Sequence, residues 1–531
     1  MDQKNVVLAF VLSMLILLGW GMLFPNKVTE QSVQVTEDVI SSKSLGSFSN
    51  QENVSKNVGD VTDSPISTTP LASSEKVINL EPFSNDVVSL TMNSQGRLVQ
   101  ASLTKYFETL GMNDTVHVLN QNDTHALFIN SGVIGLSLSE NGFSEKSRSV
   151  NDKGQMVVVF AGYLSDGTLW ERQFTLEKGS YHIAVEDRID RNSGLKLYHQ
   201  VVERNPNKDA STFNEYFGPV GLMNDQLQEV AYNDLDEMGQ KSLAAVGGWT
   251  GIMSRYFIAS IFGNQQQDYR YYYKGDGQSY QAGMFDDGVL EDGHMVFRSN
   301  MFIGPKSIPI LKDLNIGLER SVDFGWFAFI SKPLHDALTW FYSYVPNYGF
   351  SIIFLVILIK IIFYWPTQKS YESMAGMRKL QPEQKKLQER FSDDRQQMGQ
   401  EMMALYKKHK VNPLGGCLPI IIQIPVFFAL YKVLLMSIEM RHAPFIGWIQ
   451  DMSAQDPYFV LPVLMGLSML IQQRLNPQPT DPLQAKIMQF LPILFTVMFL
   501  FFPAGLVLYW VVNNVLSILQ QRMVMRRMGV E

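Results

Sequence analysis

The chain has 531 residues, of which 44 are Lys or Arg, 51 are Asp or Glu and one is Cys. Residues 25–349 hold 25 basic and 39 acidic residues, a net charge of −14, and the remainder is basic and apolar. This division excludes a single soluble globule, a disulfide-stapled mini-protein and a repeat solenoid. The acidity of the larger part also argues against direct binding of nucleic acid.

The N-terminus begins with a run of 19 mainly apolar residues, Val6 to Phe24, behind Lys4. No small-x-small cleavage site follows this run, so residues 1–25 are predicted to be an uncleaved transmembrane anchor, with a cleaved signal peptide as the alternative. Residues 26–78 are rich in Ser, Thr, Asn and Asp with little periodicity, which indicates a flexible linker.

Residues 79–325 show short alternating strand patterns separated by turn residues, which predicts one large all-β sandwich. Met156–Phe160 is a typical buried strand, and Leu169–Leu176 and Tyr181–Val185 form a predicted hairpin. Within this part only Gly248–Phe262 favours a helix.

Few residues of the β part suggest chemistry. The acidic pairs Asp286-Asp287 and Glu291-Asp292 lie near His294 and could bind a metal, but their glycine-rich surroundings favour solvated turns. No nucleophile elbow, metal-binding His spacing or phosphate-binding glycine loop is present. The lone Cys417 is expected to be a small buried apolar residue. We therefore predict no enzyme activity, no metal and no cofactor.

Residues 326–349 are expected to contain an amphipathic helix at the membrane surface. Residues 350–520 are predicted to form a membrane core of five helices, which makes six spans with the N-terminal anchor. The five apolar segments are Phe350–Trp365, Cys417–Ser437, Tyr458–Ile471, Ile487–Phe502 and Leu506–Leu519.

The charges of the connecting segments predict the topology. Residues 366–416 and the basic tail 521–531 are rich in Lys and Arg, whereas residues 438–457 contain only Arg441 against three acidic residues. The positive-inside rule then places both termini in the cytoplasm and the acidic β part outside. Residues 368–410 are expected to form a cytoplasmic helical hairpin that either docks a partner or serves only as a topology signal.

Strong polar residues lie at a similar depth in three predicted spans. Lys360, Gln423, Asn513 and Asn514 each lie about six residues from the inner end of a span. This coincidence predicts a hydrated pocket open to the cytoplasm. Two alternatives stay open: Lys360 extends to the interface on its own, and the asparagines serve as hydrogen bonds between helices.

Several motifs in these segments resemble those of the YidC/Oxa/Alb membrane-protein insertases, and the layout resembles the Gram-negative YidC form. They are Asn412-Pro413-Leu414-Gly415-Gly416-Cys417-Leu418-Pro419, Gln423-Ile424-Pro425-Val426-Phe427, Pro444-Phe445-Ile446-Gly447-Trp448, Asp456-Pro457-Tyr458 and Phe502-Pro503-Ala504-Gly505-Leu506-Val507-Leu508-Tyr509-Trp510.

The resemblance implies an ATP-independent insertase and folding chaperone of the inner (plasma) membrane of a Gram-negative bacterium, acting alone or beside the Sec translocon. It implies a positively charged groove open to the cytoplasm and to lipid. Lys360 matches the basic residue of that groove, Gln423 its glutamine and Trp510 its substrate-contacting aromatic. Relatives often have Arg and Tyr at the first and last of these positions. We place Tyr509, Asn513 and Asn514 in the same groove.

The implied partners are nascent membrane proteins, the Sec translocon with SecDF, the ribosome and the lipid bilayer. The exported domain is expected to resemble a sugar-mutarotase-like β-supersandwich, a likeness of fold and not of function.

Two other functions compete with this interpretation. A secondary transporter with a large periplasmic domain should show a repeat between its halves and a midplane site, and neither is apparent. A membrane-anchored carbohydrate enzyme would need only the first span.

Overall fold

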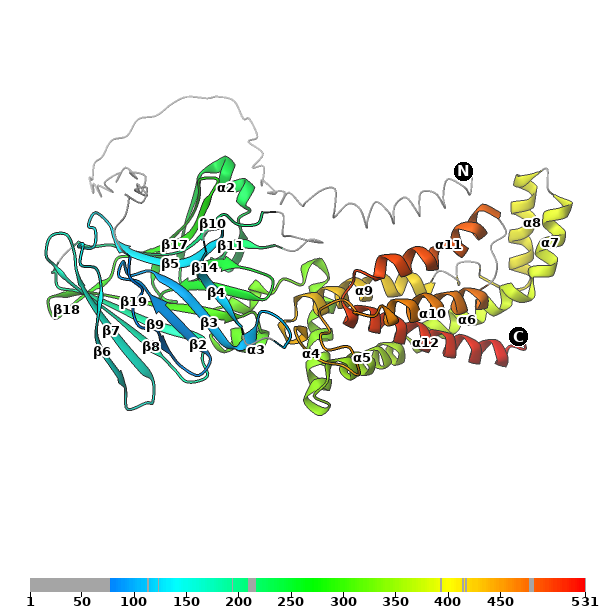
Figure 1. The fold of residues 1–531 in the computed structure, drawn as a ribbon. Helices are drawn as coiled ribbons and strands as arrows, with labels where there is room; N and C mark the ends of the chain where they lie inside the picture. The colour runs from blue at the N-terminus through cyan, green and yellow to red at the C-terminus, as the bar shows by residue number, and fades with distance from the viewer. Residues whose placement is uncertain are drawn as a thin grey trace, which may run out of the picture.

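The computed structural model describes residues 77–530, except 112–113, 123, 193, 209–215, 392–393, 413–414, 416–417 and 477–481. The predicted N-terminal anchor, nearly all of the predicted linker, and Cys417 lie outside the described residues. The described chain has two parts: a β-sandwich in its first half and a helical part in its second, which lie side by side in Figure 1.

The β part consists of antiparallel strands in two sheets. The strands are β1 Phe83–Ser84, β2 Val88–Met92, β3 Leu98–Phe107, β4 Thr115–Gln121, β5 Ala126–Val133, β6 Ser144–Val150, β7 Met156–Tyr163, β8 Leu169–Leu176, β9 His182–Ile189, β10 Leu197–Arg204, β11 Gly218–Met223, β12 Gln226–Glu229, β13 Gln240–Val246, β14 Trp249–Met253, β15 Phe257–Phe262, β16 Asp268–Gly275, β17 Ser279–Asp286, β18 Val289–Glu291 and β19 His294–Pro305.

One sheet has the order β1-β2-β3-β4-β5-β10-β17-β16-β13, and the other has the order β12-β11-β14-β15-β19-β9-β8-β7-β6, with β18 paired to β19. The predicted all-β sandwich is therefore confirmed. So is the predicted hairpin, because β8 and β9 are adjacent and antiparallel, with Phe174 opposite Val185. The side chains of β8 alternate between buried and half-buried positions, which is the expected period of a strand with one face on a core.

The predicted helix at Gly248–Phe262 is wrong. These residues form β14 and β15, an antiparallel pair that turns at Ser254–Tyr256. All five residues of β14 are buried, so both of its faces are covered and the alternation that marks a half-exposed strand is absent. The helix that does occur within the β part before residue 300, α2, spans Tyr232–Met238.

A buried ion pair lies inside the sandwich. Arg172 donates from Nε to Oδ1 of Asp187 at 2.7 Å, and Trp170 donates from Nε1 to the same oxygen at 2.6 Å. Arg172 also donates from Nη1 to the carbonyl oxygen of Gly96 at 3.1 Å, which ties β8 to the turn before β3. The side chains of both charged residues are at most 2% exposed.

Asp187→Asn should lower the free energy of unfolding by about 3–5 kcal/mol, because it leaves a buried guanidinium without its counter-charge. Denaturant unfolding of the purified chain measures this. The matched control is Asp166→Asn, which removes the partly exposed pair of Asp166 with Arg191 and should cost less than about 1 kcal/mol. Equal losses in the two variants would contradict the assignment.

The helical part follows the sandwich. Its helices are α3 Ile308–Asp313, α4 Ala328–Tyr344, α5 Tyr348–Ile362, α6 Tyr364–Lys379, α7 Gln381–Arg390, α8 Arg395–Lys408, α9 Leu418–Met436, α10 Val460–Leu475, α11 Pro482–Phe499 and α12 Ala504–Arg527. The helices α4, α5, α6, α9, α10, α11 and α12 pack into a bundle, and α7 and α8 form a hairpin that projects from its far end (Figure 1). Asp394 caps the start of α8, where its side chain accepts from the backbone N–H groups of Gln396 and Gln397.

No single helix in the described segments combines the length and the apolar composition of a membrane span. The helices α5 and α6 meet both criteria together, and the chain bends by 70° between them. The predicted number of spans therefore stays a prediction, whereas the predicted helical bundle is confirmed.

The two parts touch at several polar contacts. Ser307, just before α3, donates to Oε1 of Glu439 at 2.9 Å. Arg441 donates from Nη2 to the carbonyl oxygen of Glu108 at 2.9 Å, next to the last residue of β3. Glu229 of β12 also faces this junction, where burial and the charge of Asp323 raise its pKa to about 7, against the opposing effect of Lys306 and Lys432.

The Glu229 carboxyl makes stability depend on pH. Its folded-state pKa lies above its ordinary value near 4.5, so the folded chain holds this proton more tightly than the unfolded chain. The contribution of the Glu229 carboxyl to the free energy of unfolding is complete at acidic pH, and it is lost as pH rises through about 7. Glu229→Gln should therefore stabilise the protein at pH 8 by about 1–3 kcal/mol and have little effect at pH 5. Thermal unfolding at both pH values tests this, and an equal shift at both would contradict it.

Candidate functional site

The long helix α12 carries a line of polar side chains. Tyr509, Asn513 and Ser517 are spaced four residues apart, so they lie above one another on one face of the helix. All three are buried, at 0%, 8% and 4% exposure. A polar face inside a helical bundle requires partners on the neighbouring helices, because an unpaired polar group loses its water without compensation.

Lys360 of α5 contacts one end of this line. Its Nζ donates to Oγ of Ser517 at 2.7 Å, and Ser517 in turn donates to the carbonyl oxygen of Asn513 at 2.7 Å. Among the described residues, no carboxylate lies within ion-pair distance of Lys360. A half-buried ammonium group is thus held by a neutral hydroxyl, and its charge is not cancelled by a described neighbour.

Gln423 of α9 contacts the other end of the line. Its Nε2 donates to the hydroxyl oxygen of Tyr509. Because Tyr509 and Ser517 are eight residues apart on one helix, the two contacts are separated by about 12 Å along its axis. Lys360 and Gln423 therefore flank a polar line on α12, one from each neighbouring helix.

Two predicted site residues of α12 face elsewhere. Asn514 donates from Nδ2 to Oγ of Ser468 at 2.9 Å, which joins α12 to α10. Trp510 packs among the rings of Phe427, Phe499 and Phe495, with centroids 4.9, 5.4 and 6.4 Å away. Its Nε1 is buried without a hydrogen-bond partner among the described residues.

The structure thus brings Lys360, Gln423, Tyr509 and Asn513 to one polar line and places Asn514 and Trp510 on other faces of α12. Sequence reasoning missed Ser517, the residue that holds the Lys360 ammonium group. A signal for it was present, because Ser517 follows Asn513 by four residues and Tyr509 by eight.

The helical part has an extensive apolar surface. Large apolar side chains are exposed on several of its helices, with Ile361 67% and Phe490 60% exposed. Around α4 the exposed side chains are aromatic: Trp326 is 91% and Tyr344 is 70% exposed. Contiguous apolar surface of this kind marks contact with a membrane or another protein, and aromatic residues favour the membrane–water interface.

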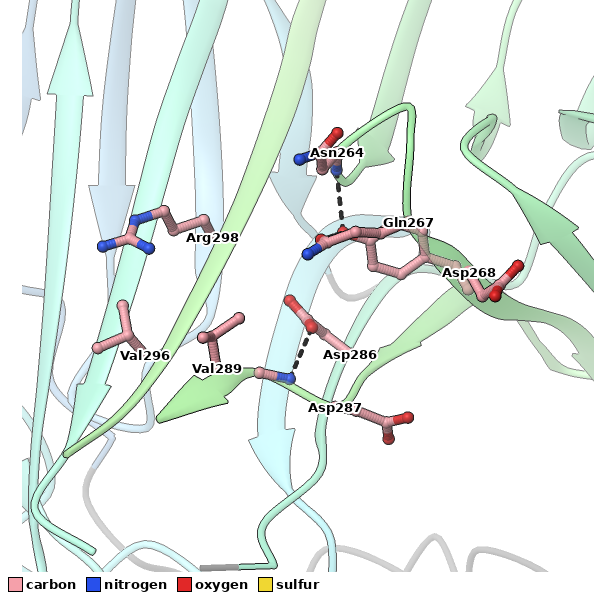
Figure 2. A pocket seen from close by; sticks show the side chains of 10 residues that line it. Asn264, Gln267, Asp268, Asp286, Asp287, Val289, Val296 and Arg298 are labelled. Atoms are coloured by element: carbon pink, nitrogen blue, oxygen red, sulfur yellow. Dashed lines mark hydrogen bonds between the residues drawn. The ribbon is translucent and has the colours of Figure 1, made fainter. Parts of the chain in front are cut away.

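Asp286 and Asp287, the first of the two acidic pairs, line a cavity of about 280 Å³ together with Arg298 and Asn264 (Figure 2). The prediction of solvated turns is wrong for Asp286, which is only 7% exposed. Burial raises the pKa of its carboxyl to about 6. Its Oδ1 accepts from the backbone N–H of Gly288 at 2.9 Å, in the turn that follows the end of β17.

Two other residues of the acidic pairs have basic partners. Asp287 pairs with Lys196 at 2.9 Å, and Glu291 binds Arg298 through two hydrogen bonds of 2.6 and 2.7 Å. No group of three or more His, Cys, Asp and Glu side chains within the described ranges is arranged to hold a metal ion.

Comparison with known proteins identifies the chain. The family described as 60Kd inner membrane protein matches residues 340–531, and the family described as YidC periplasmic domain matches residues 82–337. Membrane protein insertase YidC of Magnetococcus marinus is 41% identical over 485 residues, which cover 86% of each chain. Membrane protein insertase YidC of Pasteurella multocida is 36% identical over 557 residues, which cover 99% of this chain and 98% of the relative.

The helical bundle, its apolar surface and these relatives define a membrane protein insertase of the inner membrane. The chain belongs to the YidC family, as the sequence motifs indicated. An insertase integrates protein segments into a bilayer without making or breaking covalent bonds, which agrees with the prediction that the chain is not an enzyme.

Two solved structures were also compared. A crystal structure of an active YidC insertase, with its first transmembrane domain resolved, gives a TM-score of 0.38 at 17% identity over 84% of this chain and 92% of that chain. A mutarotase-related structure, YeaD from Salmonella typhimurium, gives a TM-score of 0.27 at 6% identity over 42% of this chain and 90% of that chain. The predicted likeness of the β part to mutarotases stays a prediction.

Trp510→Ala should destabilise the helical part, because it leaves a cavity among three phenyl rings; buried Trp→Ala changes cost about 3–5 kcal/mol. The conservative change Trp510→Phe should lower the stability of the helical part much less. Thermal unfolding in detergent micelles measures both. If Trp510→Ala unfolds at the wild-type temperature, the ring is not a packing residue of this bundle.

Proposed function

We propose that the polar line on α12, flanked by Lys360 and Gln423, receives the hydrophilic segment of an incoming membrane protein. The observation that carries this proposal is the Lys360 ammonium group, hydrogen-bonded to the Ser517 hydroxyl and not paired with a carboxylate among the described residues. Such a charge among apolar helices attracts acidic residues of a substrate and favours hydration around them.

The same residues give a mechanism that needs no nucleotide. An acidic residue near the leading end of a substrate pairs transiently with Lys360, and Gln423, about 12 Å farther along the line, replaces part of the water lost by other polar residues of the same segment. The apolar segment that follows leaves sideways into lipid, and its burial contributes about 0.8 kcal/mol per CH₂ group. The exposed apolar side chains of the bundle allow lipid to lie directly beside this path.

The orientation belongs to the same proposal. The polar line opens to the cytoplasm, both termini are cytoplasmic, and the β part is periplasmic. The proposed domain limits are 1–25 for the anchor, 26–78 for the linker, 79–325 for the sandwich, 326–349 for the interfacial helix and 350–520 for the core. The charge distribution of the connecting segments supports this arrangement.

The partners are proposed from chemistry and position. The basic hairpin α7–α8, with Lys407 and Lys408 at the end of α8, suits the ribosome or a nascent chain. The Sec translocon and SecDF are proposed as partners because an insertase that also acts as a folding chaperone receives segments released by a translocon.

Replacement of Lys360 tests the proposal. Purified protein in liposomes is supplied with a single-span substrate that has an acidic residue in its leading segment, and insertion is scored by protease protection. Lys360→Arg should retain most insertion, Lys360→Ala should reduce it several-fold, and Lys360→Glu should reduce it further because like charges repel.

The matched control is Lys369→Ala on the next helix, α6, where the ammonium group lies 3.8 Å from the ring centroid of Trp365 and outside the polar line. It should insert the substrate at the wild-type rate. Normal insertion by both Lys360→Ala and Lys360→Glu would refute the role of the charge.

A further inference from the structure

Two arginines converge on one phenyl ring at the edge of the β part, far from the polar line. The guanidinium carbon of Arg97 lies 5.7 Å from the ring centroid of Phe128, and that of Arg204 lies 5.4 Å from the same centroid. The strand register explains the convergence. Val202 lies opposite Phe128 in the β5–β10 pair, so Arg204, two residues on, projects from the same face.

This face of the sheet is separate from the core between the two sheets. Phe128, Ala126 and Val202 form a small apolar cluster of their own. The neighbouring residues Ile129 and Val201 point the other way and belong to the main core. Phe128 therefore forms an apolar floor on the outward side of the sheet, and the two guanidinium groups lie over it.

The arginines line a cavity of about 380 Å³ with the amide side chains of Gln121, Asn122 and Asn205. In the part of the chain that the structure describes, none of these five side chains makes a hydrogen bond or an ion pair. Five polar side chains with unused hydrogen-bonding groups thus surround one small cavity. Most arginines near a protein surface find a carboxylate, and several do so elsewhere in this domain.

The two positive charges are close enough to affect one another. Burial lowers the pKa of Arg97, and the charge of Arg204 lowers it further. Guanidinium groups remain protonated in proteins, so the repulsion is not relieved by loss of a proton. A bound anion relieves it, and the planar guanidinium fork suits the paired oxygens of phosphate or carboxylate.

We propose that this cavity binds a small soluble oxyanion with two negative charges, of the phosphate-monoester class. Two guanidinium groups match the charge, the amides match the hydroxyl groups of the esterified part, and a volume of about 380 Å³ holds a molecule of that size.

The position of the cavity favours a soluble ligand over a lipid headgroup. Arg97 directly precedes β3, whereas Glu108, which contacts Arg441 of the helical part, directly follows it. Ten residues of strand span about 33 Å. The cavity therefore lies at the end of β3 that is remote from the membrane-contacting helices.

The test is calorimetric titration of the full chain in nanodiscs with glycerol 3-phosphate, at an ionic strength held constant with sodium chloride. We expect saturable binding at one site per chain. Arg97→Gln and Arg204→Gln should each weaken it about tenfold or more, and the double variant should abolish it. Arg204→Lys should give an intermediate loss, because Lys keeps the charge without the planar fork.

The matched control is Arg191→Gln, which removes a surface arginine paired with Asp166 in the same domain and should leave the affinity unchanged. Succinate provides a dicarboxylate arm, and weaker binding than glycerol 3-phosphate would support the phosphate class. Equal or tighter binding of succinate would overturn that class. Absence of saturable binding, or unchanged affinity in the double variant with a wild-type unfolding temperature, would overturn the site itself.

Discussion

The helical part of the protein depends on one constraint: a polar side chain among apolar helices must find its partner on a neighbouring helix. Two faces of α12 meet this constraint. On one face, Ser517 and Tyr509 bond to Lys360 and Gln423, and on the other face Asn514 bonds to Ser468. These contacts tie α12 to α5, α9 and α10 and fix its rotation. The Lys360 ammonium group is the exception, because a hydroxyl satisfies its hydrogen bond without cancelling its charge. We propose that this remaining charge lets the bundle receive a polar segment.

The β part follows the opposite arrangement at Arg172, a fully buried cation, which is paired with a carboxylate. Arg172 and Asp187 neutralise each other inside the sandwich and fasten β8 to the turn before β3. The same turn carries Arg97, which lies over Phe128 on the outer face of the sheet. The buried Arg172–Gly96 hydrogen bond therefore helps to position the unpaired Arg97 side chain. The sandwich and the bundle meet through several polar contacts, of which the Arg441–Glu108 bond joins them at the end of β3.

Much of this architecture is predictable from the sequence, because period and charge are local properties. Alternation predicted β8 and β9. The similar depth of Lys360, Gln423 and Asn513 indicated one shared level, but the contacts of Lys360 and Gln423 with α12 are about 12 Å apart along its axis. Depth alone does not fix the angle around a helix, which is why the structure separates Trp510 and Asn514 from that line. The sequence of β14 and β15 favours a helix because a strand buried on both faces has no alternation. Asp286 is buried because of tertiary packing that no local pattern reveals.

The hairpin α7–α8 packs mainly on itself and on the end of α6, and it projects away from the bundle (Figure 1). Its folding equilibrium is therefore largely uncoupled from that of the bundle, and local opening there costs the rest of the molecule little. Substitutions and changes of length in the hairpin are consequently tolerated by the fold. Stability therefore constrains the sequence and length of the hairpin only weakly, and these can change while the core of the bundle is kept.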